Sequence, residues 1–255
     1  MFKIEDFDIK LDTEILGRQF VYCEEAESSN TVLLTYPEYD KEGMVFLVEN
    51  QTKGKGRAGR TWETLPDQNL TFSVLLKDSF IGEKPNLITL AAGVAVAQSL
   101  ENLFQLNVEL KWPNDILIEG KKICGILCES ISNNNKINKI VVGIGINVNQ
   151  TNFASSYLIN PTSIKKETKK VASRERLLSE VLNNLEKTLD LLNVNYKKVL
   201  EAWRERCKML GEKVKIVDKN KETYGVFEDI DNDGQLILKH NDEVITVSFG
   251  DVSLR

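Results

Sequence analysis

Residues 53–60 form the segment that most constrains how this chain can fold. Their sequence is Lys-Gly-Lys-Gly-Arg-Ala-Gly-Arg, which carries four positive charges and three glycines. No acidic residue lies between Glu49 and Glu63, although the whole chain has a formal net charge of -5. A flexible cationic loop on an acidic protein is suited to binding a small anion, such as a phosphate or a carboxylate.

The residues on either side of the loop limit which phosphate-binding fold it can belong to. The apolar pattern predicts strands at residues 44–48 and 70–76. Glycines 54, 56 and 59 match the dinucleotide-binding fingerprint, and residues 54–61 nearly match the phosphate loop of nucleoside triphosphatases. Both motifs require a helix directly after the loop, whereas residues 61–69 contain a proline and show no helical period.

Two other interpretations of the loop remain. A kinase glycine-rich loop fits between two strands, but the chain has no His-Arg-Asp and no Asp-Phe-Gly sequence. The plainer alternative is a solvated surface hairpin. Three glycines argue against it, because each adds conformational entropy to the unfolded chain without a gain in stability.

The rest of the first 210 residues alternates between helix and strand patterns. We expect helices from Ser28 to near Pro37, from Pro85 to about Phe104, from Ser173 along a leucine stripe, and at 196–209. We expect strands at 108–111, 123–129 and 137–148, with turn residues at 114–115 and 119–121. This pattern is typical of an α+β domain with a sheet flanked by helices.

After Gly211 the pattern changes to short strands at 214–217, 223–227, 236–238 and 244–249, which is typical of a small β-barrel. We therefore divide the chain into residues 1–210 and 211–255. Residues 229–234 match the first half of a calcium-binding EF-hand loop, but the twelfth position is His240. We expect Asp233 and Gly234 to form a hairpin turn with solvent-facing acidic neighbours, and His240 to be structural or exposed.

Composition argues against several classes of protein. No apolar run reaches 18 residues, so we predict no membrane-spanning helix, and the N-terminus does not resemble a signal peptide. The four cysteines are scattered, which favours reduced thiols in the cytoplasm, and we predict no metal site. The acidic balance argues against general nucleic-acid binding.

Two further segments carry candidate chemistry. Lys111 follows an apolar strand and precedes Trp112 and Pro113, which suits it to clamp an oxyanion or phosphate. A lysine that snorkels to solvent is the alternative. The sequence Gly-Ile-Gly-Ile-Asn from Gly143 to Asn147 places two glycines on a buried strand, which indicates that something approaches the backbone closely.

Taken together, the motifs resemble the biotin–protein ligase family. They are Ser28-Ser29-Asn30, the loop from Gly54 to Trp62, Lys111 to Asp115, Lys122 to Leu127, and Gly143 to Asn147. The resemblance implies a class II synthetase-like domain, with a mixed sheet flanked by helices, and a C-terminal SH3-like β-barrel. Residues 1–210 would bind biotin and ATP.

The resemblance also sets expectations about partners. Only about 27 residues precede Ser28, too few for the helix-turn-helix domain of the family's repressor members. We therefore expect a ligase of the class that does not bind DNA, located in the cytoplasm, with a homodimer through a sheet edge as a possibility. Lys55 stands where the family has arginine, so the charge is kept and the planar fork is lost.

The implied reaction has two steps. The carboxylate of biotin attacks the α-phosphate of ATP, giving biotinyl-5'-AMP and pyrophosphate. A lysine amine of a biotin carboxyl carrier domain then attacks the mixed anhydride. Mg²⁺ would be held mainly by the phosphates. The loop from about Lys53 to Glu63 would be mobile without ligand and would exclude water once closed.

The resemblance assigns roles to individual residues. The catalytic residues would be Lys111 and Arg57. Biotin would contact Ser28, Ser29, Asn30, Gln51, Lys55, Gly56, Arg57, Lys111 and Gly125. ATP and the adenylate would contact Arg57, Arg60, Trp62, Asn114 and Asn147.

Two alternatives stay open. One is a lipoate–protein ligase of the same fold. The other is a non-catalytic module that uses its barrel to hold a protein or RNA, although the acidic turns of that region argue against RNA.

Overall fold

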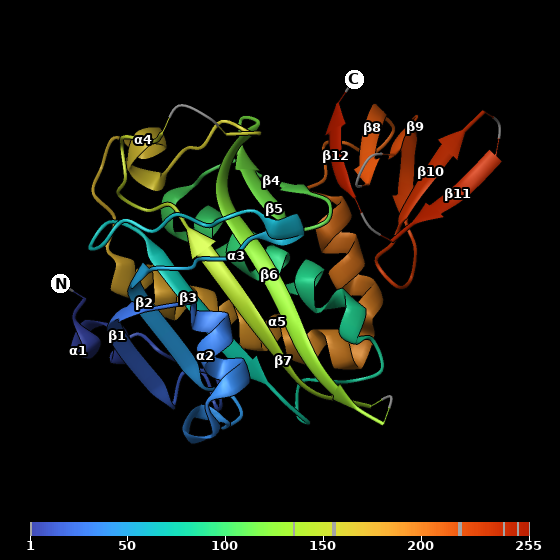
Figure 1. Cartoon of the computed structure of the whole chain (residues 1–255). Coiled ribbons are helices and arrows are strands. Elements are labelled where there is room, and N and C mark those ends of the chain that lie inside the picture. Colours follow the sequence, from blue (N-terminus) through green and yellow to red (C-terminus); the bar gives the residue numbers. More distant parts are fainter. Residues whose placement is uncertain are drawn as a thin grey trace.

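The chain folds into a main body around a seven-stranded sheet and a smaller lobe around a five-stranded sheet (Figure 1). The structure is a computed structural model that describes residues 2–134, 136–154, 157–218, 221–241, 243–248 and 250–254. The division of the chain at residues 210 and 211 stays a prediction. The first strand of the smaller lobe begins at Lys213.

The large sheet is mixed, as the sequence predicts. Its order is β1-β2-β3-β7-β6-β5-β4, with β1 and β2 parallel and every other neighbouring pair antiparallel. The strands are β1 (Phe20–Ala26), β2 (Val45–Gln51), β3 (Leu70–Leu76), β4 (Val108–Lys111), β5 (Asp115–Ile118), β6 (Lys121–Asn133) and β7 (Lys136–Ile146).

Helices cover the two faces of this sheet unequally. The short α2 (Ser29–Thr35) connects β1 to β2 and lies on one face, where Val32 and Leu33 pack on the sheet. On the other face lie α3 (Ile88–Phe104) and the long α5 (Arg174–Arg204), which pack against each other (Figure 1). Most of the core therefore lies on the α3 face, and the α2 face is left open for a site.

The helix α3 is apolar almost all round. With the short 3₁₀ turn at Pro85–Leu87 it is long and apolar enough to span a membrane by length and composition, which the sequence analysis did not expect. It is buried between the sheet and α5, and 67% of its most apolar window lies inside the protein. It is therefore the central core helix of the main body.

The helices predicted at 173–192 and 196–209 form one element, α5, with a break at Asn195 (φ -154°, ψ 79°). Its start is capped by Ser173, which accepts a hydrogen bond from the Arg176 amide. The predicted end at Met209 is wrong, because α5 ends at Arg204. The amide of Leu110 in β4 donates to the Arg206 carbonyl at 2.9 Å, and this contact turns the chain out of the helix.

Five helices and strands are missing from the sequence prediction: α1 (Ile4–Asp8), β1, β5, α4 (Ile164–Thr168) and β12 (Asp251–Leu254). The strand β5 is short and lies between two turn signals, and β1 is an edge strand without clear alternation. The shorter helices α4, Pro37–Tyr39 and Arg57–Gly59 complete the main body.

The smaller lobe is fully antiparallel, with order β11-β10-β9-β8-β12. Its strands are β8 (Lys213–Asp218), β9 (Lys221–Ile230), β10 (Leu236–His240), β11 (Glu243–Val247) and β12. The end predicted for the last strand, Phe249, lies outside the described residues.

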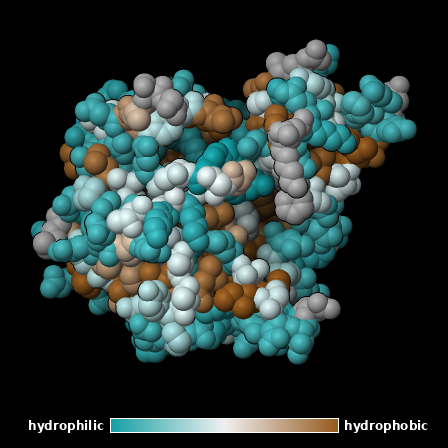
Figure 2. All heavy atoms as spheres, viewed as in Figure 1, coloured by the Kyte–Doolittle hydropathy of each residue, from teal (hydrophilic) through white to brown (hydrophobic). Residues whose placement is uncertain are grey.

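Asp233 and Gly234 lie in the turn between β9 and β10, as expected. The acidic side chains there are only partly exposed, because the turn also contacts the main body. Trp112 Nε1 donates to the Gly234 carbonyl at 2.9 Å, and Lys84 Nζ lies 2.7 Å from Asp233 Oδ1. Arg204 Nε pairs with Asp229 Oδ1 at 2.6 Å. In Figure 2 the barrel forms a separate lobe beside the main body.

Candidate active site

The cationic loop, defined as residues 53–63, folds as a tight hairpin after β2. Lys55 and Thr61 form a β-bridge, and the Gly56 amide donates to the Arg60 carbonyl at 2.7 Å. A 3₁₀ turn at the tip includes Ala58, whose φ is 53°. No helix follows the loop within residues 61–69, which agrees with the exclusion of both nucleotide-binding motifs.

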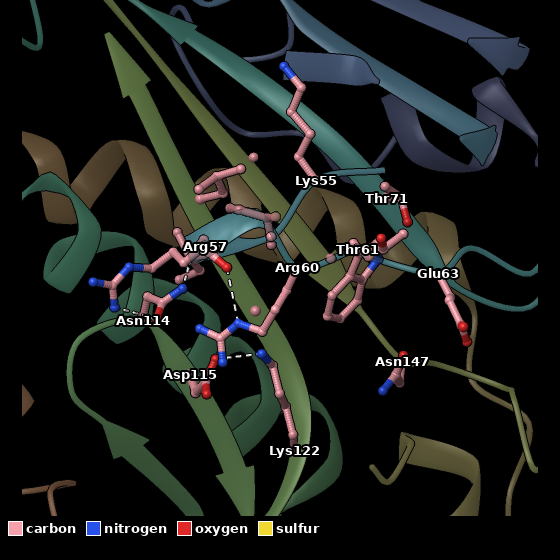
Figure 3. A pocket seen from close by; sticks show the side chains of 18 of the residues that line it. Lys55, Arg57, Arg60, Thr61, Glu63, Thr71, Asn114, Asp115, Lys122 and Asn147 are labelled. Atoms are coloured by element: carbon pink, nitrogen blue, oxygen red, sulfur yellow. Dashed lines mark hydrogen bonds and ion pairs between the residues drawn. The ribbon is translucent and has the colours of Figure 1, made fainter. Parts of the chain in front are cut away.

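The hairpin covers a cavity on the α2 face of the sheet (Figure 3). Nearly every residue that the sequence assigned to the site lines this one cavity. They are Ser28, Ser29, Asn30, Gln51, Lys55, Gly56, Arg57, Arg60, Trp62, Asn114, Gly125 and Asn147. The exception is Lys111, which does not line the cavity and is 9% exposed.

One end of the cavity holds a network of amides and hydroxyls. Gln51 Oε1 accepts hydrogen bonds from the Ser29 amide at 2.8 Å and from Ser29 Oγ at 3.1 Å. Asn30 Nδ2 donates to the Leu127 carbonyl and to Glu129 Oε2. Ser28 occupies the cap position of α2 and makes no side-chain cap bond.

The buried Ser73 of β3 joins this network. Its hydroxyl lies 2.7 Å from Ser29 Oγ and 2.6 Å from Asn30 Oδ1. The sequence analysis gave Ser73 no role. Its signal is a second hydroxyl two residues after Thr71, on the same face of a strand that is otherwise apolar.

The two glycines of β7 make room for side chains of the site. A Cβ at Gly143 would lie 2.3 Å from Asn30 Oδ1, and a Cβ at Gly145 would lie 2.2 Å from the Trp62 ring. The expectation that something approaches this strand closely is confirmed. The buried Trp62 Nε1 has no hydrogen-bond partner among the described residues, and it lies against Gly145.

Cations gather at the other end of the cavity. Arg57 Nη1 donates to Asn114 Oδ1 at 3.3 Å, and Asn114 is held by its bond to the Ile126 carbonyl. Burial lowers the pKa of Arg57, and the negative charge of Asp251 is the first of the influences that oppose this shift. Arg57 therefore offers a partly desolvated guanidinium beside the sheet.

Lys122 lines the cavity, as Lys55 does. Its Nζ lies 2.6 Å from Asp115 Oδ1 and 5.8 Å from the centroid of the Trp62 ring. Lys111 lies behind this pair, with its Nζ 3.9 Å from Asp115 Oδ2. Burial lowers the pKa of Lys111, and Asp115 opposes that shift.

In the sequence, Lys122 belongs to the Lys122 to Leu127 motif but has no predicted role. The signal available was a lysine at the start of an apolar strand that also carries Gly125. The analysis also did not identify Phe153 and Tyr157, which line the cavity from the segment after β7.

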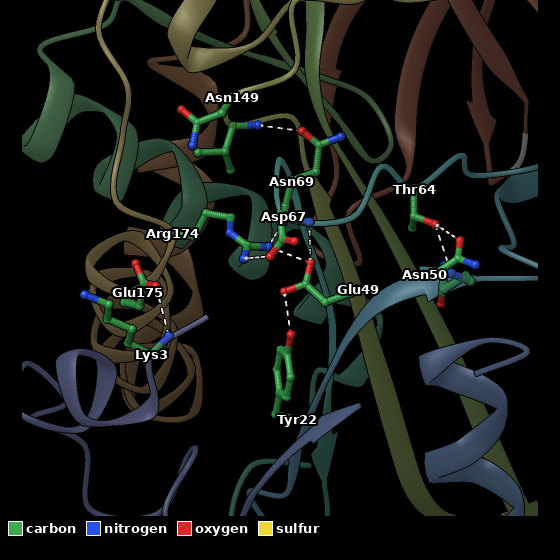
Figure 4. A network of polar contacts seen from close by, with 12 residues as sticks. Lys3, Tyr22, Glu49, Asn50, Thr64, Asp67, Asn69, Asn149, Arg174 and Glu175 are labelled. Atoms are coloured by element: carbon green, nitrogen blue, oxygen red, sulfur yellow. Dashed lines mark hydrogen bonds and ion pairs between the residues drawn. The ribbon is translucent and has the colours of Figure 1, made fainter. Parts of the chain in front are cut away.

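A buried ion pair fixes the strands that carry the loop (Figure 4). Arg174, the first residue of α5, places Nη1 2.7 Å from Glu49 Oε2 and 3.1 Å from the Asn69 carbonyl. Glu49 Oε2 also accepts the Asp67 amide at 2.8 Å. The end of β2 and the start of β3 are therefore held together beneath the loop.

Comparison with known sequences agrees with this arrangement. The profile of the Biotin/lipoate A/B protein ligase family matches residues 23–147, and that of the Biotin protein ligase C terminal domain matches residues 209–255. The Biotin--[acetyl-CoA-carboxylase] ligase of Mycobacterium tuberculosis is 31% identical over 84% of this chain and 79% of its own length. The Bifunctional ligase/repressor BirA of Bacillus subtilis is 28% identical over 99% of this chain and 79% of its own length.

Comparison with solved structures extends the match to the fold. The biotin protein ligase from Aquifex aeolicus in complex with biotin and ATP superposes with a TM-score of 0.82 at 28% identity. The match covers 93% of this chain and 99% of the other. From the cavity with its cationic loop, both profiles and these relatives, it follows that the chain belongs to the biotin–protein ligase family.

Proposed function

We propose that this protein activates biotin with ATP to biotinyl-5'-AMP and transfers biotin to a lysine of a biotin carboxyl carrier domain. The observation that carries the proposal is a single cavity with two chemically different ends. One end presents amides and hydroxyls, and the other presents three side-chain cations: Arg57, Arg60 and Lys122. A carboxylate and a triphosphate repel each other, and the cationic end offsets that repulsion.

The amide end suits the ureido ring of biotin. Ser29, Asn30 and Gln51 supply donors and acceptors on a rigid frame, and Ser28 and Gly125 complete this wall. Lys55 and Gly56 belong to the loop above it. In this arrangement the carboxylate of biotin points toward Arg57.

Lys122 is the better placed of the two lysines to bind the carboxylate and the α-phosphate. It lines the cavity, whereas Lys111 is buried behind Asp115. We propose that Lys122 stabilises the charge that develops as the carboxylate attacks phosphorus. The predicted clamp, Lys111, contributes its charge through Asp115.

The adenosine end is proposed to lie near Trp62 and Asn147. Both line the cavity, and the indole face suits an adenine ring. Arg57, Arg60 and Asn114 would contact the phosphates or the ribose.

Mg²⁺ is proposed to enter with the triphosphate. Among the described residues, the carboxylates that line the cavity are Glu63 and Asp115, and Asp115 is paired with Lys122. Within the described residues no group of three or more His, Cys, Asp or Glu side chains could hold a metal ion. These residues fit a cation whose other ligands are phosphate oxygens and water.

The proposed partner is a biotin carboxyl carrier domain of a carboxylase. Support comes from relatives that are named biotin--[acetyl-CoA-carboxylase] ligases. We propose that the protein acts in the cytoplasm, where its free thiols stay reduced. A net charge of -5 argues against a second function on DNA. A homodimer would use β1 or β4, the two edge strands of the large sheet.

The test is ATP–pyrophosphate exchange with biotin or lipoate, followed by transfer to a carrier domain. Biotin-dependent exchange is expected, and lipoate-dependent exchange alone would instead support the lipoate ligase. Lys122→Ala is expected to lower the exchange rate by about 100-fold or more, because it removes a donor to the developing charge. The control is Lys121→Ala, whose side chain pairs with Glu119 and Glu167 outside the cavity. A Lys111→Ala variant that loses more activity than Lys122→Ala would reverse the assignment of the two lysines.

A further inference from the structure

The cationic loop is fixed at its base and lightly held at its tip. At the base, the Lys53 amide donates to the Glu27 carbonyl at 2.8 Å, and the Gln51 amide donates to Thr64 Oγ1 at 2.9 Å. Toward the tip, Arg57 reaches Asn114 and Arg60 reaches the barrel. The position of the tip therefore depends on a few side-chain contacts.

The contact of Arg60 crosses from the main body to the barrel. Its Nη2 lies 2.8 Å from Asp251 Oδ1, while its Nε donates to the Arg57 carbonyl inside the loop at 3.0 Å. Asp251 begins β12 and pairs with Val217 of β8, so its backbone is set by the barrel sheet. The barrel thus presents a carboxylate from a rigid strand to the loop.

The barrel does not need this ion pair to stay on the main body. Trp112, Lys84 and Arg204 make separate contacts with the 229–234 region. Loss of the Asp251 carboxylate is therefore expected to release the loop without releasing the barrel.

We propose that Asp251 is a positioning residue for adenylate formation, which holds the cationic loop over the cavity through Arg60. This role rests on the proposed function of the cavity. The pair is half-exposed, with side-chain exposures of 41% for Arg60 and 36% for Asp251. An exposed pair of this kind shifts a local equilibrium by about two- to five-fold, which holds the loop and still allows it to open.

If Arg60 only binds phosphate, the KM for ATP of Asp251→Asn should change in the opposite direction. If Arg60 serves only to bind phosphate, Asp251 competes with ATP for the guanidinium, and Asp251→Asn lowers the KM for ATP. If Asp251 holds the loop, Asp251→Asn raises that KM by about two- to five-fold and leaves kcat less changed.

A ligand-free measurement tests the holding role independently of any activity. Trypsin cleavage after Arg57 and acrylamide quenching of Trp62 both report loop opening, since Trp112 and Trp203 are each 2% exposed. Asp251→Asn is expected to speed cleavage by about two- to five-fold. Asp251→Glu, which keeps the charge, is expected to restore much of the protection.

Asp233→Asn is the matched control, because it breaks an ion pair between barrel and main body that does not involve the loop. It is expected to leave cleavage and quenching unchanged. Arg60→Gln should increase acrylamide quenching of Trp62 as much as Asp251→Asn does. The variant that carries both substitutions should increase quenching no further. Wild-type behaviour of Asp251→Asn, or equal opening by Asp233→Asn, would overturn the proposal. If the wild-type enzyme shows no biotin-dependent exchange, the proposed function is overturned. The ligand-free cleavage and quenching measurements still test whether Asp251 holds the loop.

Discussion

At the residue scale, the bottom of the site depends on Gly125 and Gly145, whose lack of a side chain leaves room for the Trp62 ring. Trp62 lies against Gly145 so closely that even a methyl group would overlap its indole ring. Gly125 lies under the same ring, with a Cβ there 3.2 Å from Trp62 Cζ3. The indole therefore occupies one defined position against β6 and β7.

Gly145→Ala should displace Trp62 and weaken ATP binding. Stacking of a base on an aromatic ring is worth about 1–3 kcal/mol, so the KM for ATP should rise by about 5- to 100-fold. Steady-state exchange kinetics measure this. Gly93→Ala is the control, because its Cβ would meet only Leu110 Cδ2 at an ordinary 3.6 Å. Unchanged ATP kinetics in Gly145→Ala would mean that Trp62 does not contact the nucleotide.

Residue-level motifs predicted most of the cavity lining, but they could not predict the direction of Lys122. In a regular strand Lys122 and Gly125, three residues apart, would face opposite sides. The pairing of β5 with β6 shifts register at Ile116 and Leu117, and Lys122 Cε lies 3.1 Å from a Cβ placed on Gly125. A β-bulge of this kind re-aims a side chain next to a site, and it depends on the partner strand.

At the element scale, the first turn of α5 organises the two strands that lead into and out of the cationic loop. Arg174 is buried with Glu49 and is also bonded to the Asn69 carbonyl. The leucine stripe predicted the first part of α5, up to about Leu192. It gave no sign that the first residue of this helix would reach between β2 and β3, because that contact joins residues far apart in the sequence.

Arg174→Met should destabilise the protein by about 3–5 kcal/mol, because it leaves the Glu49 carboxylate buried without its cation. Urea unfolding measures the change. The double variant Arg174→Met with Glu49→Gln should recover part of the loss. The exposed Arg176→Met, two residues away, should stay within about 0.5 kcal/mol of wild type. A loss below about 1 kcal/mol for Arg174→Met would show that Glu49 is rehydrated or protonated in the variant.

At the scale of the whole molecule, the barrel is joined to the main body through Trp112. From the sequence, Trp112 is known only to follow Lys111, and the structure buries it with its N–H on Gly234. The regular spacing of short strands was sufficient to predict the barrel. The way it docks was not predictable, because the contacts of Trp112 and Lys84 with the 231–235 turn are set only once both domains are folded.

Trp112→Phe should keep most of the packing and lose the bond to Gly234. Such a hydrogen bond contributes about 0.5–1.5 kcal/mol to stability, and leaving the Gly234 carbonyl without a partner can raise the loss to about 3 kcal/mol. Thermal unfolding should show this loss with adenylation activity retained. If Trp112→Phe lowers activity as much as Asp251→Asn does, then docking of the whole barrel controls the loop.

The burial of α3 has a consequence for how the protein is made. The helix ends at Phe104, whereas its covering helix α5 starts at Arg174. At ~5–20 residues per second, a ribosome needs several seconds to synthesise the stretch between them. For that time the nascent chain carries an apolar helix, similar in length and composition to a membrane span, without its cover. This helix is therefore where a chaperone would bind the growing chain.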